Sequence, residues 1–359
     1  MSELHMIDLT RLHSAVRAVV RGFGSEQAEV DTVADNLIEA NLTGHDSHGI
    51  GMLPRYVEAY QQGGLVPNRH VQTALDAGTL LRLDGGAGFG QVIGRETMEL
   101  GIARALQHGS CIVALGNSHH LGRIGAWAEL AVSAGLVSLH FVNVLTRSIV
   151  APYGGSDARF GTNPFAAGVP LTGRPPVILD FATSMMAQGK TRVAFNKGEL
   201  VPPGCLLDDQ GRPTLEPRFG VNPPFGALLA FGEHKGYGLA LLCELLGGAL
   251  AAGMTQHSED VTQRRILNGM LTILIDPAAL ARREHFERET LAFIDWVKAS
   301  PAREGYQAVR IAGEPEREMR AQRTTLGVPV DAITWKEILE AARKLGVDPA
   351  EVNAAAGQA

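Results

Sequence analysis

Apolar residues near the N-terminus recur at intervals of three and four residues, the spacing of one face of an amphipathic helix. The first apolar stripe contains Leu9, Leu12, Val16, Val19 and Val20, and glycines follow it at positions 22 and 24. Ser25 can cap a second helix, whose stripe contains Val30, Val33, Leu37 and Ile38. Pro54 can begin a third, short helix. The pattern predicts that residues 1–65 are mostly helical.

From residue 79 the pattern changes to alternating strands and helices. Strands are predicted at 79–84, 111–115 and 136–142, with helices at 91–107 and 124–133 between them. Residues 151–209 are rich in Gly and Pro, which predicts loops folded over a site and one strand at 177–180. Helical patterning returns from about residue 282 and includes 335–344. The chain therefore reads as a layered α/β protein with helices at both ends.

Composition adds limits on partners and compartment. With 359 residues, 45% of them hydrophobic, the chain can build more than one lobe. The net charge of −6 comes without a basic stripe, so a nucleic-acid partner is not expected. The apolar stretch 236–254 is interrupted by Glu244, which disfavours a membrane span, and no signal peptide is recognised. Cys111, Cys205 and Cys243 lack metal-ligand spacing, so we expect reduced cysteines in a cytoplasmic protein.

A glycine-rich segment after the strand at 79–84 resembles a dinucleotide-binding turn but departs from it. Gly88, Gly90 and Gly94 give G-x-G-x-x-x-G, and the next strand ends at Gly116 and Asn117, where an acid should bind the ribose. The sequence therefore predicts close helix–sheet packing at these glycines rather than a Rossmann fold.

The segment Gly44–Ile50 is the densest group of proton-handling side chains in the chain. His48 is the candidate general acid/base, because imidazole exchanges protons near neutral pH, and Asp46 and Ser47 can orient its ring. A structural role for His48, as a helix cap or in a polar niche, is the alternative. A zinc site of a hydrolase, built from His45, His48, His119 and His120, is another, although the spacing does not match a zinc motif.

Five motifs occur in a fixed order: D-S-H-G-I at 46–50, N-S-H-H-L-G-R-I-G at 117–125, G-T-N-P-F at 161–165, L-D-F-A-T-S at 179–184 and H-K-G-Y-G-L at 234–239. Together they resemble the type 2 malate/L-lactate dehydrogenase family, the L-sulfolactate dehydrogenase-like enzymes. Residues 189–194 and 201–208 look closest to the subgroup called hydroxycarboxylate dehydrogenase B.

The resemblance implies a fold, a cofactor and a reaction. The fold would be a non-Rossmann mixed sheet that binds NAD or NADP (76–281), with a helical domain built from both chain termini (1–75 and 282–359), in a homodimer. The reaction would be reversible hydride transfer at C2 of a small-molecule 2-oxo or 2-hydroxy acid, without metal. A cyclic imino-acid reductase of the same fold is the alternative. Such relatives have an acid where this chain has Lys190, which argues against it.

The resemblance also implies site residues. For catalysis these are His48, Asp46, Ser47 and His120, either histidine being the proton donor. For the cofactor they are His48, Gly122, Arg123, Ile124, Ile178, Leu179, Asp180, Phe181, Ala182, His234, Lys235, Asn268, Gly313, Glu314, Pro315 and Glu316. For the substrate they are Met52, Arg55, Tyr56, Arg147 and Thr162.

One position departs from the family pattern. Many members have an arginine where this chain has Met52, so Arg55 or Arg147 would have to hold the substrate carboxylate. A methionine there also suggests larger or aromatic 2-oxo acids.

Overall fold

A seven-stranded mixed sheet forms the centre of the molecule in the computed structural model, which describes residues 4–257 and 265–358. Strands β3 and β4 are parallel, and every other neighbouring pair is antiparallel. This mixed arrangement confirms the predicted non-Rossmann fold class. In spatial order the strands are β2 (Gln72–Asp76), β3 (Leu80–Asp84), β4 (Ser110–His119), β11 (Leu267–Ile275), β5 (Val137–Leu145), β6 (Phe165–Val169) and β7 (Val177–Phe181).

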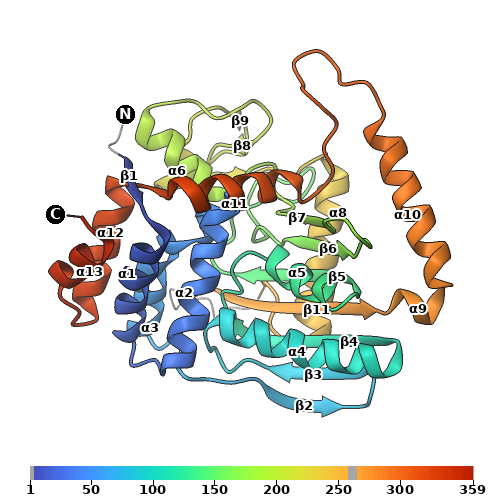
Figure 1. Ribbon diagram of the computed structural model, residues 1–359. Helices are drawn as coiled ribbons and strands as arrows, with labels where there is room; N and C mark the ends of the chain where they lie inside the picture. The colour runs from blue at the N-terminus through green and yellow to red at the C-terminus, as the bar shows by residue number, and fades with distance from the viewer. Residues whose placement is uncertain (1–3, 258–264, 359) are drawn as a thin grey trace.

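Helices cover both faces of this sheet. Helices α4 (Gly90–His108) and α5 (Gly125–Ser133) lie in front of it in Figure 1, and α8 (His234–Leu242) lies behind it, continued by a π-helix, η3 (Cys243–Leu250). A Cβ at Gly94 would meet the Trp127 ring at 2.4 Å, and one at Gly90 would meet the His120 carbonyl oxygen at 2.1 Å. Gly90 therefore packs closely against the end of β4, as predicted, whereas Gly94 packs against helix α5 rather than against the sheet.

The two ends of the chain build the helical part together. Strand β1 (Leu4–Ile7) pairs antiparallel with β12 (Val328–Asp331), so the termini lie on one side of the molecule (Figure 1). One hydrophobic core, from Ile7 to Ala356, joins the N-terminal helices to the C-terminal ones. These helices are α1 (Leu9–Arg21), α2 (Gln27–Leu42), α3 (Leu53–Gln61), α12 (Ala332–Lys344) and α13 (Pro349–Ala356).

Local chemistry sets the ends of these helices. The Asp8, Asp331 and Asp348 carboxylates accept hydrogen bonds from the first free N–H groups of α1, α12 and α13. Ser25 does not cap α2 as predicted, because the cap position is Glu26 and the Ser25 hydroxyl donates to Glu29 instead, at 2.6 Å.

The segment predicted as loops is more regular than expected. Besides β7 it contains β6 and α6 (Gln188–Lys197), which the sequence does not signal because the middle of β6 is Ala-Ala-Gly and α6 is largely polar. A short second sheet, with α7 (Arg218–Val221), lies beside α6. Its strands are β8 (Leu206–Leu207), β9 (Pro213–Thr214) and β10 (Ala227–Leu228).

Three of the later helices lie apart from the helical core. The short α9 (Pro277–Leu280) leads into α10 (Arg283–Lys298), which stands at the far side of the molecule from the termini (Figure 1). Helix α11 (Glu314–Leu326) runs along the top of the molecule in this view and reaches the upper end of α2. No helix among the described residues is long and apolar enough to cross a membrane.

Candidate active site

The histidine loop lies between α2 and α3 as two short 3₁₀ turns, Asp46–His48 and Ile50–Met52. The Asn41 side chain ties both turns to α2: its Nδ2 donates to Asp46 Oδ1 at 2.6 Å, and its Oδ1 accepts from the Ile50 N–H at 2.9 Å. A Cβ at Gly49 would collide with this amide, so glycine is required there. The loop is therefore held in place from α2.

Asp46 does not contact the His48 ring, contrary to the expected orienting role. Its two carboxylate oxygens accept hydrogen bonds from Arg323 of α11, at 2.7 and 3.1 Å. The reason is that α11, distant in sequence, supplies a guanidinium that pairs with both oxygens at once. Asp46 thus fixes the loop, and Ser47 is the neighbour that touches the ring, with its Oγ 3.0 Å from His48 Nδ1.

His48 and His120 face each other as a stacked pair. Their ring centroids lie 5.5 Å apart with an angle of 16° between the planes. Burial, with the nearby charges of His45 and Arg123, lowers the pKa of His48 to about 4, and burial and the His48 ring hold the pKa of His120 well below its usual value. Both imidazoles are therefore neutral near pH 7.

Tyr56 is buried behind His120. Its hydroxyl lies 2.7 Å from His120 Nδ1 and accepts a hydrogen bond from Gln91 Nε2 at 2.8 Å. The resemblance places Tyr56 at the substrate, but in this structure its hydroxyl contacts Gln91 on one side and His120 on the other. Met52, 7% exposed, belongs to the core of the helical part.

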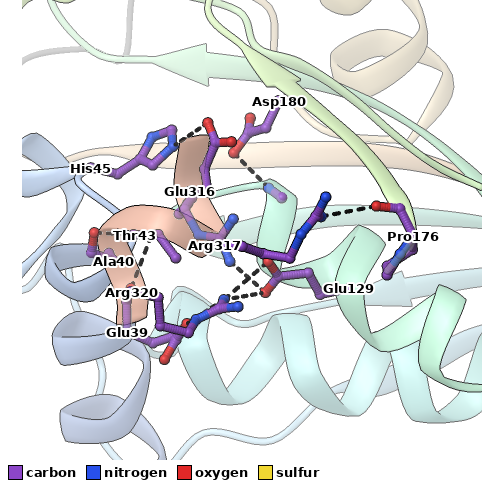
Figure 2. A network of polar contacts seen from close by, with 12 residues as sticks. Glu39, Ala40, Thr43, His45, Glu129, Pro176, Asp180, Glu316, Arg317 and Arg320 are labelled. Atoms are coloured by element: carbon purple, nitrogen blue, oxygen red, sulfur yellow. Dashed lines mark hydrogen bonds and ion pairs between the residues drawn. The ribbon is translucent and has the colours of Figure 1, made fainter. Parts of the chain in front are cut away.

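A second polar cluster lies around the start of α5 and the first half of α11 (Figure 2). The Asp180 carboxylate, at the end of β7, accepts a hydrogen bond from the Gly125 N–H at 2.7 Å. The N-terminus of α5, which directly follows the expected cofactor residues 122–124, thus already holds a protein carboxylate. Burial raises the pKa of Asp180, against the influence of His45 and Arg123.

Arg123 is the most buried cation of this cluster, at 2% exposure. Its Nη2 pairs with Glu129, which also accepts from Arg320 of α11 at 3.1 Å, and Arg320 pairs in turn with Glu39 of α2 (Figure 2). Its Nη1 is buried without a hydrogen-bond partner in the described part of the chain. A buried N–H group that lacks a partner is costly, so Nη1 fits an acceptor that the protein itself does not supply.

The turn at Gly313, just before α11, is hydrogen-bonded to the start of β7. The Ile178 N–H donates to the Ala312 carbonyl at 3.2 Å, and Arg317 donates to the Pro176 carbonyl at 2.9 Å. His45 lies 3.6 Å from Glu316, so it belongs to this cluster rather than to the His48 pair. The segments 122–124, 178–182 and 313–316, all predicted at the cofactor, are thereby brought together.

The other predicted residues have different surroundings. Asn268 is buried, and its amide accepts from the Leu121 N–H at 2.8 Å and donates to the Asn143 carbonyl at 2.9 Å, so the side chain anchors the segment after His120. His234 and Lys235 are exposed at the start of α8. Thr162 is half-buried, and its carbonyl accepts from Thr183.

Two exposed arginines lie on the side of the histidine loop. Arg55 and Arg147 are both exposed, and Arg147 lies 3.7 Å above the Phe225 ring. Desolvation and the neighbouring Arg192 of α6 lower the pKa of Arg55, and desolvation and Arg55 lower that of Arg147. Helix α6 begins beside the loop, since a Cβ at Gly189 would lie 3.4 Å from that of Ser47. The sequence did not single out Arg192.

A zinc site is not formed by the described residues. Within 4–257 and 265–358, no three His, Cys, Asp or Glu side chains gather so that they could hold a metal ion. His45 points to Glu316, while His48 and His120 stack, so the proposed ligand set is divided between two clusters.

Comparison with known proteins places this geometry in a family. The sequence profile described as malate/L-lactate dehydrogenase matches residues 7–339. The chain belongs to the malate/L-lactate dehydrogenase family. Hydroxycarboxylate dehydrogenase B of Escherichia coli K12 is 50% identical over 345 residues, covering 96% of this chain and 95% of that protein.

Solved structures of the malate/L-lactate dehydrogenase family agree in fold. An E. coli structure provisionally described as a malate/lactate dehydrogenase superposes with a TM-score of 0.94 at 49% identity and covers 98% of both chains. Sulfolactate dehydrogenase of Methanocaldococcus jannaschii gives a TM-score of 0.85 at 30% identity, covering 97% of this chain and 99% of the other. The relatives are dehydrogenases, and the hydrolase alternative finds no support among them.

Proposed function

We propose that this protein is an NAD(P)-dependent 2-hydroxycarboxylate dehydrogenase that reversibly reduces 2-oxo acids. The observation that carries the proposal is the stacked His48–His120 pair, which lies next to exposed arginines and near a buried guanidinium without a partner. The imidazoles can transfer a proton and form a hydrogen bond to the substrate's C2 oxygen, and the arginines can bind a carboxylate. Together these are the groups that reduction of a 2-oxo acid requires.

Arg123 and its surroundings are the proposed cofactor contacts. Nicotinamide supplies or accepts the hydride when the cofactor is bound. Arg123 Nη1 would donate a buried hydrogen bond to a phosphate or ribose oxygen. The turn Gly313–Glu316, together with Ile178 and Asp180, would line the cofactor next to Arg123. The exposed Lys235 at the start of α8 would add a charge for phosphate.

His48 is proposed to move the proton at the C2 oxygen. It receives the hydroxyl proton during oxidation and returns it during reduction, and Ser47 holds its Nδ1 edge. Arg55, with Arg147 and Arg192, is proposed to bind the C1 carboxylate in place of the arginine that Met52 replaces.

A substrate panel tests this proposal. Oxaloacetate, pyruvate, 2-oxoglutarate, phenylpyruvate and a piperideine carboxylate would each be mixed with NADH and with NADPH and followed by absorbance. We expect consumption with at least one 2-oxo acid, and a KM about 10-fold or more higher in Arg55→Ala, since a charge-assisted pair is lost. A reaction with the piperideine carboxylate alone would favour the imino-acid reductase. Consumption with none of the five would refute the dehydrogenase.

We also propose that the protein works as a homodimer in the cytoplasm. Phe293 and Trp296 of α10 are 63% and 73% exposed and stack at 5.9 Å, and Leu242, Leu245 and Leu250 are exposed on α8 and η3. Large exposed apolar residues of this kind mark interaction surfaces. The cytoplasmic location is proposed from the cysteine positions in the sequence, which match neither a disulfide framework nor a metal site.

The dimer would be tested by sedimentation of Trp296→Glu against the wild type. We expect the charge to shift the equilibrium toward monomers, because it would be buried in an apolar contact. Arg288→Glu, on the same helix, is the control for charge alone. A wild type that sediments as a monomer would contradict the proposal.

A further inference from the structure

The hydrogen-bond chain behind His120 has a direction. Gln91 Nε2 donates to the Tyr56 hydroxyl at 2.8 Å, and this hydroxyl lies 2.7 Å from His120 Nδ1. A phenol has a single hydrogen, and an amide nitrogen can only donate. Tyr56 is fully buried, and Gln91 and His120 are the partners of its hydroxyl among the described residues. If the hydroxyl accepted from both, its own hydrogen would be left without a partner, so the satisfied arrangement directs that hydrogen to Nδ1. His120 Nδ1 is therefore the acceptor, and the ring proton of the neutral imidazole lies on Nε2.

The surroundings of His120 favour the neutral ring. The titratable or charged groups that face it are His48, His119 and Arg55, besides Tyr56, and none of them is an anion at neutral pH. A second positive charge at 5.5 Å from a protonated His48, in a buried site, would be strongly unfavourable. At most one of the two stacked rings can therefore be a positively charged imidazolium. Since His48 is less buried than His120, it is the ring that can be protonated at the lower cost.

We propose that Gln91 and Tyr56 hold His120 as the neutral Nε2–H tautomer, so that His120 donates a hydrogen bond to the substrate's C2 oxygen while His48 alone gains and loses the proton. The inference rests on the proposed dehydrogenase function. During reduction C2 accepts a hydride from the dihydronicotinamide, which is oxidised to the pyridinium. The carbonyl π pair becomes an oxygen lone pair and takes the proton of the His48 imidazolium, whose N–H bond breaks. His120 keeps its proton throughout.

Tyr56 and Gln91 are positioning residues in this scheme, because they act through His120. A fixed N–H directed at an oxygen that gains negative charge stabilises the transition state without any proton transfer. The buried hydrogen bond from Tyr56, whose hydroxyl is itself held by Gln91, keeps the His120 ring in place, so the ring needs no reorganisation when the charge develops.

Substitutions with glutamine separate the two histidines. Glutamine places an amide N–H close to the Nε2 position of histidine but cannot carry a proton back and forth. We expect His120→Gln to keep at least about 10-fold more kcat than His120→Leu, and His48→Gln to be as inactive as His48→Ala. Rescue of His48 by glutamine, but not of His120, would overturn the assignment.

Nitrogen NMR of the full-length protein with ring-labelled histidine tests the tautomer without turnover. The His120 signals, identified by their loss in His120→Gln, should show an unprotonated Nδ1 and a protonated Nε2.

In Tyr56→Phe this single tautomer should become a mixture of the two neutral forms, with kcat about 10- to 100-fold lower. Tyr60→Phe, on the same helix, should match the wild type. A protonated Nδ1 in the wild type, or an unchanged His120 in Tyr56→Phe, would refute the proposal. If no 2-oxo acid is reduced, the dehydrogenase function fails, yet this spectrum still decides the tautomer.

Discussion

Replacing His48 with alanine is expected to lower kcat at least about 100-fold, the usual scale for a lost general acid or base, while cofactor affinity changes little. The site would keep Arg55 for the substrate and the Arg123 cluster for the cofactor, so binding should survive. Steady-state kinetics with the best acid of the panel, and fluorescence titration with NADH or NADPH, measure the two effects. His70→Ala, which removes an exposed imidazole paired with Glu96, is the control.

The pH dependence of the wild type gives an independent check on His48. Burial lowers its pKa in the free protein to about 4, so the proton needed for reduction is scarce at pH 7. The value of kcat/KM for reduction should therefore rise about 10-fold per pH unit as the pH falls toward that pKa, and for oxidation it should stay level above it. Near-normal turnover of His48→Ala, or a flat reduction profile, would remove His48 from the mechanism.

Gly90→Ala is expected to destabilise the protein by about 2 kcal/mol or more and to impair turnover at the same time. The added Cβ would lie 2.1 Å from the His120 carbonyl oxygen and 2.6 Å from that of His119. These are backbone atoms and cannot rotate aside, so either α4 or the segment at the end of β4, His119 and His120, must shift, at the cost typical of overpacking. Denaturant unfolding measures the loss of stability.

Gly238→Ala is the matched control for this prediction. Gly238 lies in α8 with nothing within 4 Å of an added Cβ, so alanine should be neutral or stabilise by up to about 1 kcal/mol through helix propensity. Equal unfolding midpoints for Gly90→Ala and the wild type would show that the close approach of α4 to the His120 segment is not required.

Local patterns predicted much of the fold. The apolar stripe that begins at Leu9 forms α1, and the missing ribose-binding acid after the Gly90–Gly94 segment correctly argues against a Rossmann fold. Helix α6 was missed because its buried face is minimal, with Thr191 as its buried residue. Its position beside Ser47 depends on tertiary contacts that no periodicity records.

The candidate site was predictable only where its residues share a motif. The motif of 46–50 indicated His48, and the one of 117–125 indicated His120 and Arg123. Sequence patterns could not reveal three of the polar pairs: Arg323 with Asp46, Arg320 with Glu39, and Gln91 with Tyr56. In each pair the two residues lie far apart in the sequence, and the first is an ordinary polar side chain in a helix. Such pairs are fixed by how helices pack, which a single sequence does not reveal.

The position of helix α11 near the C-terminus affects when the site can form during protein synthesis. Its side chains pair with His45, Asp46 and Glu39, residues that leave the ribosome some 270 positions earlier in the chain. A nascent chain that has not yet released residues 314–326 has the histidine loop but not the guanidinium that holds it. Catalytic competence should therefore arrive only near the end of translation, and fragments that end before residue 314 should be inactive whatever else they have folded.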